Sequence, residues 1–318
     1  MDFNWCFIGA GNIARRVAKE LVTNKGHHIV SIYNRTKEKA ISFGKTYSSR
    51  VYDTALEAIK DERVNSVYIA TNNNTHYQYI KLCLENHVPV LCEKPLTGNS
   101  KELKELIGLA NKENTYLCEA MWTWFNPVSL KVKEWIKSNE IGKILSVDAR
   151  FTAPILSYRK KNSRLSNLDS YGGALLDLGV YPIRYVHELF GKPLSITSKG
   201  KLFRGCDKSN ESIFKYDGFE AKIISRIDLF VGEYVKIIGE KGYIKVPFFH
   251  RSGKAILKND NGRLVIRDKS LKYAKQFKTV AEDVSNNKKE SISLKSSLEV
   301  IEMMDEIRKQ IGVRYSCD

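Results

Sequence analysis

Three small residues near the start of the chain have the types and the spacing of a dinucleotide-binding turn. Gly9, Gly11 and Ala14 form a Gly-x-Gly-x-x-Ala pattern between an apolar run and an amphipathic segment. Gly9 permits a tight turn, Gly11 has no side chain to keep a pyrophosphate from the backbone, and Ala14 lets a helix pack closely on a sheet. The N–H groups of Asn12 and Ile13, at the start of that helix, could then bind the phosphates.

The residues after the second expected strand indicate which dinucleotide fits. An NAD site usually has Asp or Glu here, to bind the ribose hydroxyls. This chain has the neutral Asn34, followed by Arg35 and, one helical turn further on, Lys39. Both cations would attract a 2′-phosphate, so the pattern favours NADP over NAD, with NAD still possible. The alternative interpretation of Arg35 is an ordinary surface arginine.

Two further loops follow predicted strands at the same edge of the sheet. Thr71, Asn72 and His76 belong to a polar loop that could line the cofactor, although asparagine-rich turns also form for local reasons. Glu93-Lys94-Pro95 ends the next strand, close to where a nicotinamide ring is expected. There the cation of Lys94 could hold a hydroxyl or carbonyl oxygen, or lower the pKa of a neighbouring acid group.

These loops require a parallel sheet whose strands alternate with helices. Apolar runs typical of buried strands alternate with amphipathic segments, and the runs span residues 5–8, 29–33, 66–70, 89–92 and 116–119. This alternation predicts an α/β fold in which residues 1–120 form a doubly wound parallel sheet, a Rossmann domain. Ligands of such sheets bind at the carboxyl ends of the strands, where the loops described above lie.

The composition changes after residue 120, and residues 121–318 are expected to form a second, α+β domain. A helix carrying Val132 and Trp135 comes first, and Gly239-Glu240-Lys241-Gly242 has the composition of a hairpin turn. An apolar stripe over residues 294–311 predicts a closing helix that packs on the core. Short strands at close spacing predict a mixed or antiparallel sheet; they span residues 144–151, 196–203, 219–230, 234–239, 243–246, 255–257 and 264–266.

Motifs in a fixed order make the chain resemble the glucose–fructose oxidoreductase/inositol dehydrogenase (Gfo/Idh/MocA) family. They are Gly9-Ala10-Gly11, the loop from Ala70 to His76, Glu93-Lys94-Pro95, Glu119-Ala120-Met121-Trp122-Thr123, the segment from Gly172 to Tyr181, and the segment from Glu306 to Val313. The later motifs are similar to those of the dimeric dihydrodiol dehydrogenases, which also act as NADP-dependent xylose dehydrogenases. The resemblance spans nearly the whole chain.

This resemblance implies an oxidoreductase that transfers a hydride between a nicotinamide cofactor, NADP rather than NAD, and the hydroxyl or carbonyl carbon of a sugar, polyol or cyclic diol. It also implies a large open, mostly antiparallel sheet in the second domain, through which relatives commonly form a homodimer. A regulator that binds NADP without turnover is the rival class of protein. An inositol-type or sugar-phosphate dehydrogenase is the alternative enzyme.

The resemblance also assigns catalytic roles to Lys94, Asp177 and Tyr181. Tyr181 matches the proton carrier, which is histidine in many relatives and tyrosine in the dihydrodiol branch. Lys94 would stabilise the alkoxide or phenolate, and Asp177 would hydrogen-bond the lysine or the substrate. Asp177 and Tyr181 are four residues apart and would share a helix face, although Pro182 must kink or start that helix. A sensor needs no such proton relay.

Aromatic and basic residues are candidates for contact with the substrate. Trp122 and Trp124 could form a wall over the substrate or nicotinamide ring, and packing at a domain interface is the alternative. The dihydrodiol branch usually has arginine at the position of Trp124 and an aromatic residue at that of Asn126, which leaves the substrate open. Arg164 could bind a carboxylate; it lies in the basic segment 156–170, either a solvated loop or a flap.

Composition excludes several other classes of protein. The net charge is +16, but the 52 basic residues are interleaved with 36 acidic ones, which argues against nucleic-acid binding. Six cysteines and six histidines lack metal-ligand spacing, so we expect no metal. No run approaches the roughly 18 apolar residues of a membrane span, and no signal peptide precedes the glycine turn. We therefore expect no membrane partner and a cytoplasmic location.

Overall fold

The computed structural model describes residues 2–251, 253–270 and 273–318. It divides into two compact units, each described separately below. The first unit comprises the described residues of 1–97, 101–122 and 271–297, and the second those of 98–100, 123–270 and 298–318. Residues 271–297 are therefore grouped with the first unit, although they lie within the range expected from the sequence for the second domain.

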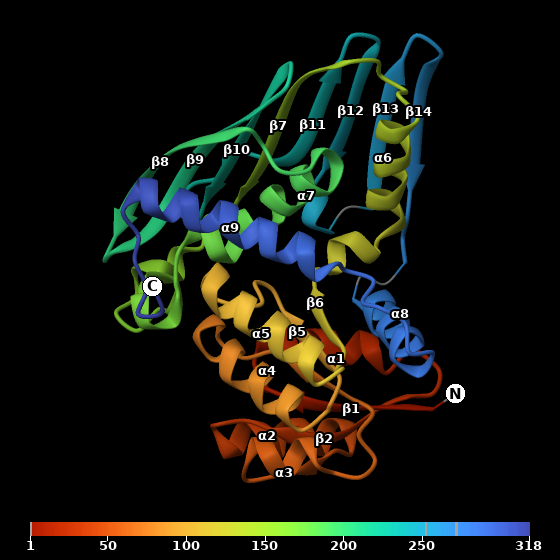
Figure 1. Ribbon diagram of the computed structural model, residues 1–318, viewed down its shortest axis with the longest axis vertical. Helices are drawn as coiled ribbons and strands as arrows, with labels where there is room; N and C mark the ends of the chain where they lie inside the picture. Colours follow the sequence, from red (N-terminus) through yellow and green to blue (C-terminus); the bar gives the residue numbers. More distant parts are fainter. Residues whose placement is uncertain (1, 252, 271–272) are drawn as a thin grey trace. The chain divides into compact units, whose positions relative to one another are not determined.

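The first unit contains a six-stranded parallel sheet in the order β3-β2-β1-β4-β5-β6, which confirms the predicted doubly wound fold (Figure 1). Its strands β4, β5 and β6 are buried along their whole length, which explains why their sequences are continuous apolar runs. The strands are β1 (Phe3–Ile8), β2 (His27–Tyr33), β3 (Arg50–Val51), β4 (Ser66–Ile69), β5 (Val90–Glu93) and β6 (Leu117–Ala120). The helices are α1 (Asn12–Leu21), α2 (Lys37–Tyr47), α3 (Ala55–Ile59), α4 (His76–Glu85), α5 (Ser100–Lys112) and α8 (Ala274–Ser285).

Helix α8 packs on the first sheet, although it comes far later in the chain. Its residue Phe277 is fully buried, with its ring centroid 4.9 Å from that of Trp5 on β1 and 5.1 Å from that of Tyr68 on β4. Glu20 of α1 accepts a hydrogen bond from the N–H of Tyr273, just before α8, at 2.6 Å. The sequence patterns do not predict this helix, and it completes the core on one face of the sheet.

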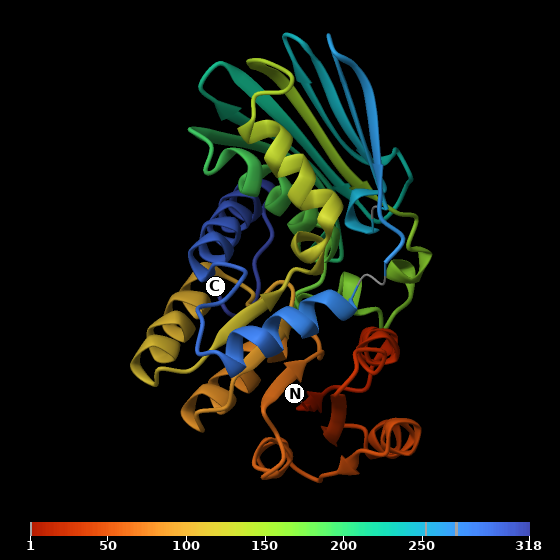
Figure 2. The same cartoon turned by 90° about the vertical axis from the view of Figure 1, so that its right-hand side faces the viewer.

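The second unit contains an eight-stranded mixed sheet in the order β14-β13-β12-β11-β7-β10-β9-β8. Only β7 and β10 pair in parallel, so the predicted mostly antiparallel sheet is confirmed. Helices α6, α7 and α9 lie on one side of it (Figures 1 and 2). The strands are β7 (Ile144–Thr152), β8 (Ser195–Phe203), β9 (Cys206–Tyr216), β10 (Phe219–Arg226), β11 (Glu233–Gly239), β12 (Gly242–Pro247), β13 (Lys254–Asn259) and β14 (Gly262–Arg267). The helices are α6 (Pro127–Lys137), α7 (Val180–Phe190) and α9 (Leu294–Ile311), of which α9 begins in residues grouped with the first unit.

Strand β9 is the one long strand that the sequence patterns do not predict. Its sequence, Cys206–Tyr216, is mostly polar. Asp207, Asn210 and Ser212 are nevertheless buried, because hydrogen bonds compensate for the loss of water. Asn210 donates to Asp207 at 2.7 Å and accepts from Ser225 at 2.9 Å. A buried polar strand therefore has no apolar signature.

Two general features follow from the described residues. None of the helices over residues 2–251, 253–270 and 273–318 is long and apolar enough to cross a bilayer. All six cysteines are free thiols, five of them buried and Cys317 partly exposed.

Candidate functional site

The glycine turn after β1 has the geometry of a site that admits phosphate to the backbone. Gly9 has φ +109°, and a Cβ there would lie 2.5 Å from the carbonyl oxygen of Ala70, so only glycine fits. Gly11 has ordinary extended backbone, and no atom lies within 4 Å of an added Cβ. The space in front of Gly11 is therefore open, while Gly9 holds the turn against the loop after β4.

The start of α1 can bind an anion. Gly11 provides no side-chain cap, and the first turn contains no acidic residue. The N–H groups of Asn12 and Ile13, at the beginning of a helix, have no carbonyl partner within that helix and carry its partial positive charge. Asn12 is exposed and Ile13 is half-buried. These backbone groups fit the pyrophosphate of a dinucleotide.

Asn34 at the end of β2 connects the glycine turn to α2. Its Oδ1 accepts a hydrogen bond from the N–H of Ala10 at 3.0 Å, and its Nδ2 donates to the carbonyl of Thr36 at 2.9 Å. An aspartate could accept the first bond but could not donate the second. The amide at this position thus has a structural reason, in addition to avoiding a negative charge near a phosphate.

The two predicted phosphate-binding cations, Arg35 and Lys39, are exposed at the surface. The nearby carboxylate of Asp53 is paired with Lys37, with 2.6 Å between Nζ and Oδ1. Thr36 is the N-cap residue of α2, but its side chain makes no capping bond. The positive charge of Arg35 and Lys39 is therefore available to an anion beside Asn34.

His76 joins two of the predicted loops from the inside of the unit. It is fully buried, with Nδ1 2.9 Å from the carbonyl oxygen of Pro95 and Nε2 3.4 Å from that of Thr71. A hydrogen on Nδ1 donates to Pro95, and this bond fixes the loop after β4 against the turn that follows Lys94. The structure thus places His76 behind these loops, whereas Asn72 is exposed.

Glu93 and Lys94, at the end of β5, lie in different environments. The Glu93 side chain is buried and accepts a hydrogen bond from the Tyr68 hydroxyl at 2.6 Å. Burial raises the pKa of Glu93, and the Tyr68 bond and the charge of Lys94 only partly oppose that shift. Lys94 is half-buried. Glu93 therefore faces the core, and Lys94 is the more accessible group of the motif.

In the second unit, Asp177 and Tyr181 lie on two joined helical segments. A π-helical turn over Leu175–Gly179 carries Asp177, and α7 begins immediately after it and carries Tyr181. Pro182, which cannot donate a backbone hydrogen bond, lies in the first turn of α7. Of the two expected effects of Pro182, a kink or a helix start, the structure shows the start: α7 begins two residues before Pro182, directly after the π turn. Such turns are frequent at functional sites.

Arg164 contacts Asp177 directly. Its Nη2 lies 2.9 Å from Asp177 Oδ1, and the Asp177 side chain is only 16% exposed. Arg164 begins a 3₁₀ turn within the segment predicted to be a loop or flap. Parts of that segment are packed, since Tyr158 and Leu165 are buried. The sequence does not predict the Arg164–Asp177 pair.

Tyr181 is buried among side chains that the sequence motifs do not identify. Its ring centroid lies 5.6 Å from that of Phe151 and 5.9 Å from that of His250. The Nδ1 atom of His250 is hydrogen-bonded to Glu233, which is only 8% exposed. Glu233 shares the buried face of β11 with Val235, and an acidic residue in such an alternating pattern is the signal that could have revealed this pair.

The tryptophans and Asn126 have structural partners. Trp122, in the first unit, lies 4.8 Å from Tyr273 between ring centroids, and Trp124, in the second, lies 5.0 Å from Tyr185. Asn126 caps α6, because its Oδ1 accepts a hydrogen bond from the N–H of Val128 at 2.9 Å. This capping role accounts for a polar residue at position 126.

Metal ligation has no support in the described part of the chain, where no group of three or more His, Cys, Asp or Glu side chains could hold an ion. The candidate features of the first unit are the open helix start, the cations beside Asn34, and Lys94, and those of the second unit are Asp177 and Tyr181. An open helix start after the first strand of a doubly wound sheet is typical of the dinucleotide-binding domain of an oxidoreductase.

Comparison with known proteins identifies the family. Residues 3–120 match the family described as "Oxidoreductase family, NAD-binding Rossmann fold", and residues 129–245 match the GFO/IDH/MocA C-terminal domain. The chain belongs to this Gfo/Idh/MocA oxidoreductase family, as its motifs predicted.

Individual relatives extend over the full chain. A trans-1,2-dihydrobenzene-1,2-diol dehydrogenase of Xenopus tropicalis is 31% identical, with 99% of this chain and 100% of the relative covered. The scyllo-inositol 2-dehydrogenase (NADP(+)) IolU of Bacillus subtilis is 30% identical, with 99% and 98% covered. The solved structure of KijD10, a 3-ketoreductase from Actinomadura kijaniata in complex with NADP, has a TM-score of 0.89 at 21% identity, covering 99% of each chain. That structure has the same fold.

Proposed function

We propose that the chain is an NADP-dependent dehydrogenase that interconverts a hydroxyl and a carbonyl group on a sugar, polyol or cyclic diol. The observation that carries the proposal is the end-to-end similarity to a diol dehydrogenase and to an NADP(+)-dependent inositol dehydrogenase. Lys94, Asp177 and Tyr181 belong to motifs that resemble those of the family. A bound nicotinamide would supply or accept the hydride.

The residues of the first unit would bind the cofactor. The start of α1 and the open space at Gly11 would receive the pyrophosphate. Arg35 and Lys39 would bind the 2′-phosphate beside Asn34. Two further loops would line the cofactor with Thr71, Asn72, Glu93 and Lys94. The buried His76 would hold these two loops together through Thr71 and Pro95.

The polar residues of the two units would manage the proton. Tyr181 would exchange it with the substrate hydroxyl, and Lys94 would stabilise the alkoxide or phenolate that forms. Asp177, oriented by Arg164, would hydrogen-bond the lysine or the substrate. Because Arg164 already pairs with Asp177, a carboxylated substrate has less support than an uncharged one. Trp122 and Trp124 remain candidates for an apolar wall.

A substrate panel with matched variants tests the proposal. Aldoses, polyols and diols are assayed with NADP and with NAD by nicotinamide absorbance. Replacing Lys94→Met or Tyr181→Phe should lower kcat by about 10²- to 10⁴-fold, the usual contribution of acid–base catalysis. Lys137→Met, at the exposed end of α6, serves as the control and should leave kcat unchanged. Wild-type rates in the Lys94 and Tyr181 variants would refute their catalytic roles.

A homodimer and a cytoplasmic location are further parts of the proposal. Helices α6, α7 and α9 lie on one side of the second sheet, and its other side carries half-buried polar residues, such as Tyr234, which donates to Asp148 at 3.1 Å. That side is the surface proposed to contact a second copy. Sedimentation equilibrium should give the mass of two chains, and the mass of one chain would contradict the dimer. The free thiols fit a reducing compartment.

A further inference from the structure

We infer that the segment Tyr315–Asp318, which follows α9, is a positioning element for the proposed active site. It contacts two short segments of the second unit. One is residues 98–100, which follow Lys94-Pro95 along the chain, and the other is Gly172, which precedes the π-helical turn with Asp177. The inference rests on the proposed function for the roles of Lys94 and Asp177, and on the contacts themselves for the rest.

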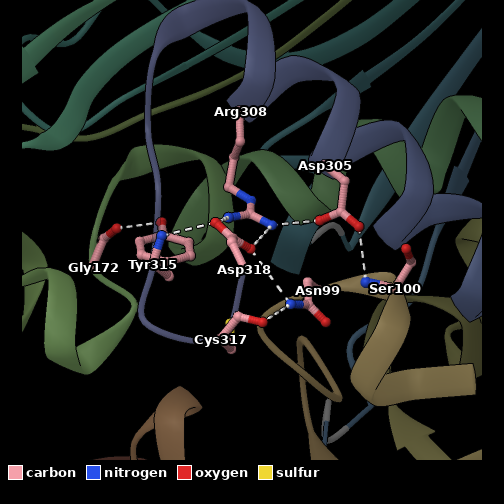
Figure 3. A network of polar contacts seen from close by, with 8 residues as sticks. All are labelled: Asn99, Ser100, Gly172, Asp305, Arg308, Tyr315, Cys317 and Asp318. Atoms are coloured by element: carbon pink, nitrogen blue, oxygen red, sulfur yellow. Dashed lines mark hydrogen bonds and ion pairs between the residues drawn. The ribbon is translucent and has the colours of Figure 1, made fainter. Parts of the chain in front are cut away.

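Arg308 of α9 anchors the segment through a buried ion pair (Figure 3). Its Nη1 lies 2.6 Å from Asp318 Oδ2, and its Nη2 lies 3.0 Å from Asp318 Oδ1 and 2.6 Å from Asp305 Oδ1. Arg308 is only 3% exposed. Burial alone would lower its pKa, but the two carboxylates raise it overall. The planar guanidinium thus holds both acids in one fixed geometry.

The segment is bent back on itself over this arginine. The N–H of Tyr315 donates to Asp318 Oδ2 at 2.8 Å, and the Tyr315 ring centroid lies 4.7 Å from the Arg308 guanidinium carbon. A tyrosine ring at that distance attracts the cation. Tyr315 and Asp318 therefore both contact the Arg308 side chain, and this fixes the segment relative to α9.

Residues 98–100 are held by the segment and by α9. Asn99 Nδ2 donates to the carbonyl of Cys317 at 2.7 Å, and the N–H of Ser100 donates to Asp305 Oδ2 at 2.8 Å (Figure 3). Gly98 has no space for a side chain, since a Cβ would lie 2.5 Å from the Tyr171 ring and 2.9 Å from the sulfur of Cys317. Every residue from 95 to 99 is buried, so a shift at Asn99 would be transmitted toward Lys94.

Gly172 is held by the same segment. The Tyr315 hydroxyl donates to the carbonyl of Gly172 at 2.6 Å, and Tyr315 is only 5% exposed. A Cβ on Gly172 would lie 2.3 Å from the carbonyl oxygen of Arg164. The next residue, Gly173, accepts a hydrogen bond from the N–H of Asp177 at 3.3 Å. Tyr315 therefore holds Gly172, which packs against the backbone of Arg164 and directly precedes the residue that binds the N–H of Asp177.

These contacts give the segment a role in positioning in addition to the stability that its ion pair with Arg308 contributes. Helix α9 is secured independently by its buried stripe, which includes Ile301, Met304 and Ile307. Loss of the segment would leave that stripe and the Ser100–Asp305 bond in place but would release Asn99 and Gly172 together. A displacement of about 1 Å at a catalytic group can reduce the rate roughly a hundredfold. Tyr315→Phe, which keeps the Arg308–Asp318 pair, is thus expected to affect kcat more than stability.

Two variants test the inference: removal of residues 315–318, and Tyr315→Phe, which loses only the hydroxyl. With a substrate found in the panel, removal should lower kcat by about ten- to a hundredfold, and Tyr315→Phe should lower it less. The isotope effect with the same substrate deuterated at the reacting carbon should rise in both, because hydride transfer becomes slower. The Kd for NADPH should stay within about twofold, since the glycine turn belongs to the other unit. Lys309→Met, exposed on α9, is the control.

Hydrogen exchange separates this inference from the proposed function. Amide exchange is measured over residues 98–103 and 164–177, in wild type and in both variants, without any substrate. Faster exchange in both regions of the shortened protein, with unchanged exchange over residues 9–14, supports the inference even if no substrate is turned over. Unchanged exchange in either region, or unchanged kcat and isotope effect in both variants of an active enzyme, overturns it.

Discussion

The buried carboxyl group of Asp207 should make the stability of the protein depend on pH in an unusual direction. Asp207 is fully buried on β9. Its Oδ2 accepts hydrogen bonds from the N–H of Leu175 at 2.9 Å and from Asn210 at 2.7 Å, but Oδ1 has no hydrogen-bond partner within the described residues. Burial raises the pKa from 3.8 to about 7, despite these bonds and the charge of Arg308.

The sign follows from proton binding in the two states. Between pH 4 and pH 7 the folded protein keeps a proton on Asp207 that the unfolded chain has lost. The contribution of Asp207 to stability is therefore complete below the unfolded pKa of 3.8 and is lost as pH rises through the folded pKa of about 7. One pKa unit corresponds to about 1.4 kcal/mol, so the shift amounts to about 4 kcal/mol of unfolding free energy.

The variant Asp207→Asn removes this titration while preserving an acceptor for Leu175. Its unfolding free energy should exceed that of wild type by about 1–2 kcal/mol at pH 5, where only the unfolded chain has lost the proton, and by about 4 kcal/mol at pH 8. Urea unfolding from pH 5 to pH 8 measures both values. Asp217→Asn, exposed in the next turn, is the control. The same pH dependence in wild type and Asp207→Asn would refute the reasoning.

Two further predictions concern the first unit. Gly9→Ala should lower the unfolding free energy by about 1–3 kcal/mol, because Gly9 has a positive φ and an added Cβ would meet Ala70. Gly11→Ala should unfold like wild type but bind NADPH more weakly. Equal melting temperatures for the two variants would contradict this difference. Arg35→Ala should raise the Kd for NADPH about 10- to 100-fold by removing a charge-assisted bond, with little change for NADH. An equal loss for both cofactors, in a fluorescence titration, would remove Arg35 from the 2′-phosphate site.

The sequence predicts the first sheet well because parallel strands are buried on both faces. β1, β4, β5 and β6 are apolar runs, and glycine, proline or polar residues end each of them. It could not predict that α8 would pack on this sheet. The amphipathic pattern of residues 274–285 indicates only that one face is buried, and the Phe277 contacts are made across a long separation in sequence.

The second unit is predicted less completely, because hydrogen bonds hide the pattern of burial. β9 carries Asp207, Asn210 and Ser212 toward the interior, and in the sequence these residues resemble a loop. In helix α7 every residue from 180 to 187 is buried, so it is packed on all sides. Because the helix contains Arg184 and His187, its sequence does not indicate that all of its sides are buried.

Motifs identify the residues of the candidate site, but not their neighbours. Asn34 was predicted beside the cofactor, and its two bonds to Ala10 and Thr36 could not be deduced from composition. Arg164 was considered as a partner for a substrate, and its contact with Asp177 depends on how a 3₁₀ turn folds back. Pairing between distant segments is a property of the tertiary structure alone.

The position of α8 has a consequence for how the protein forms as it is synthesised. The strands of the first sheet leave the ribosome early, but Phe277, which covers Trp5, Phe7 and Tyr68, is made only after the strands of the second sheet. A fragment ending at residue 120 would expose these rings to water, and exposed apolar surface promotes aggregation. The first unit is therefore completed only after α8 has been synthesised. Until then, its aromatic face would need protection from aggregation on the nascent chain.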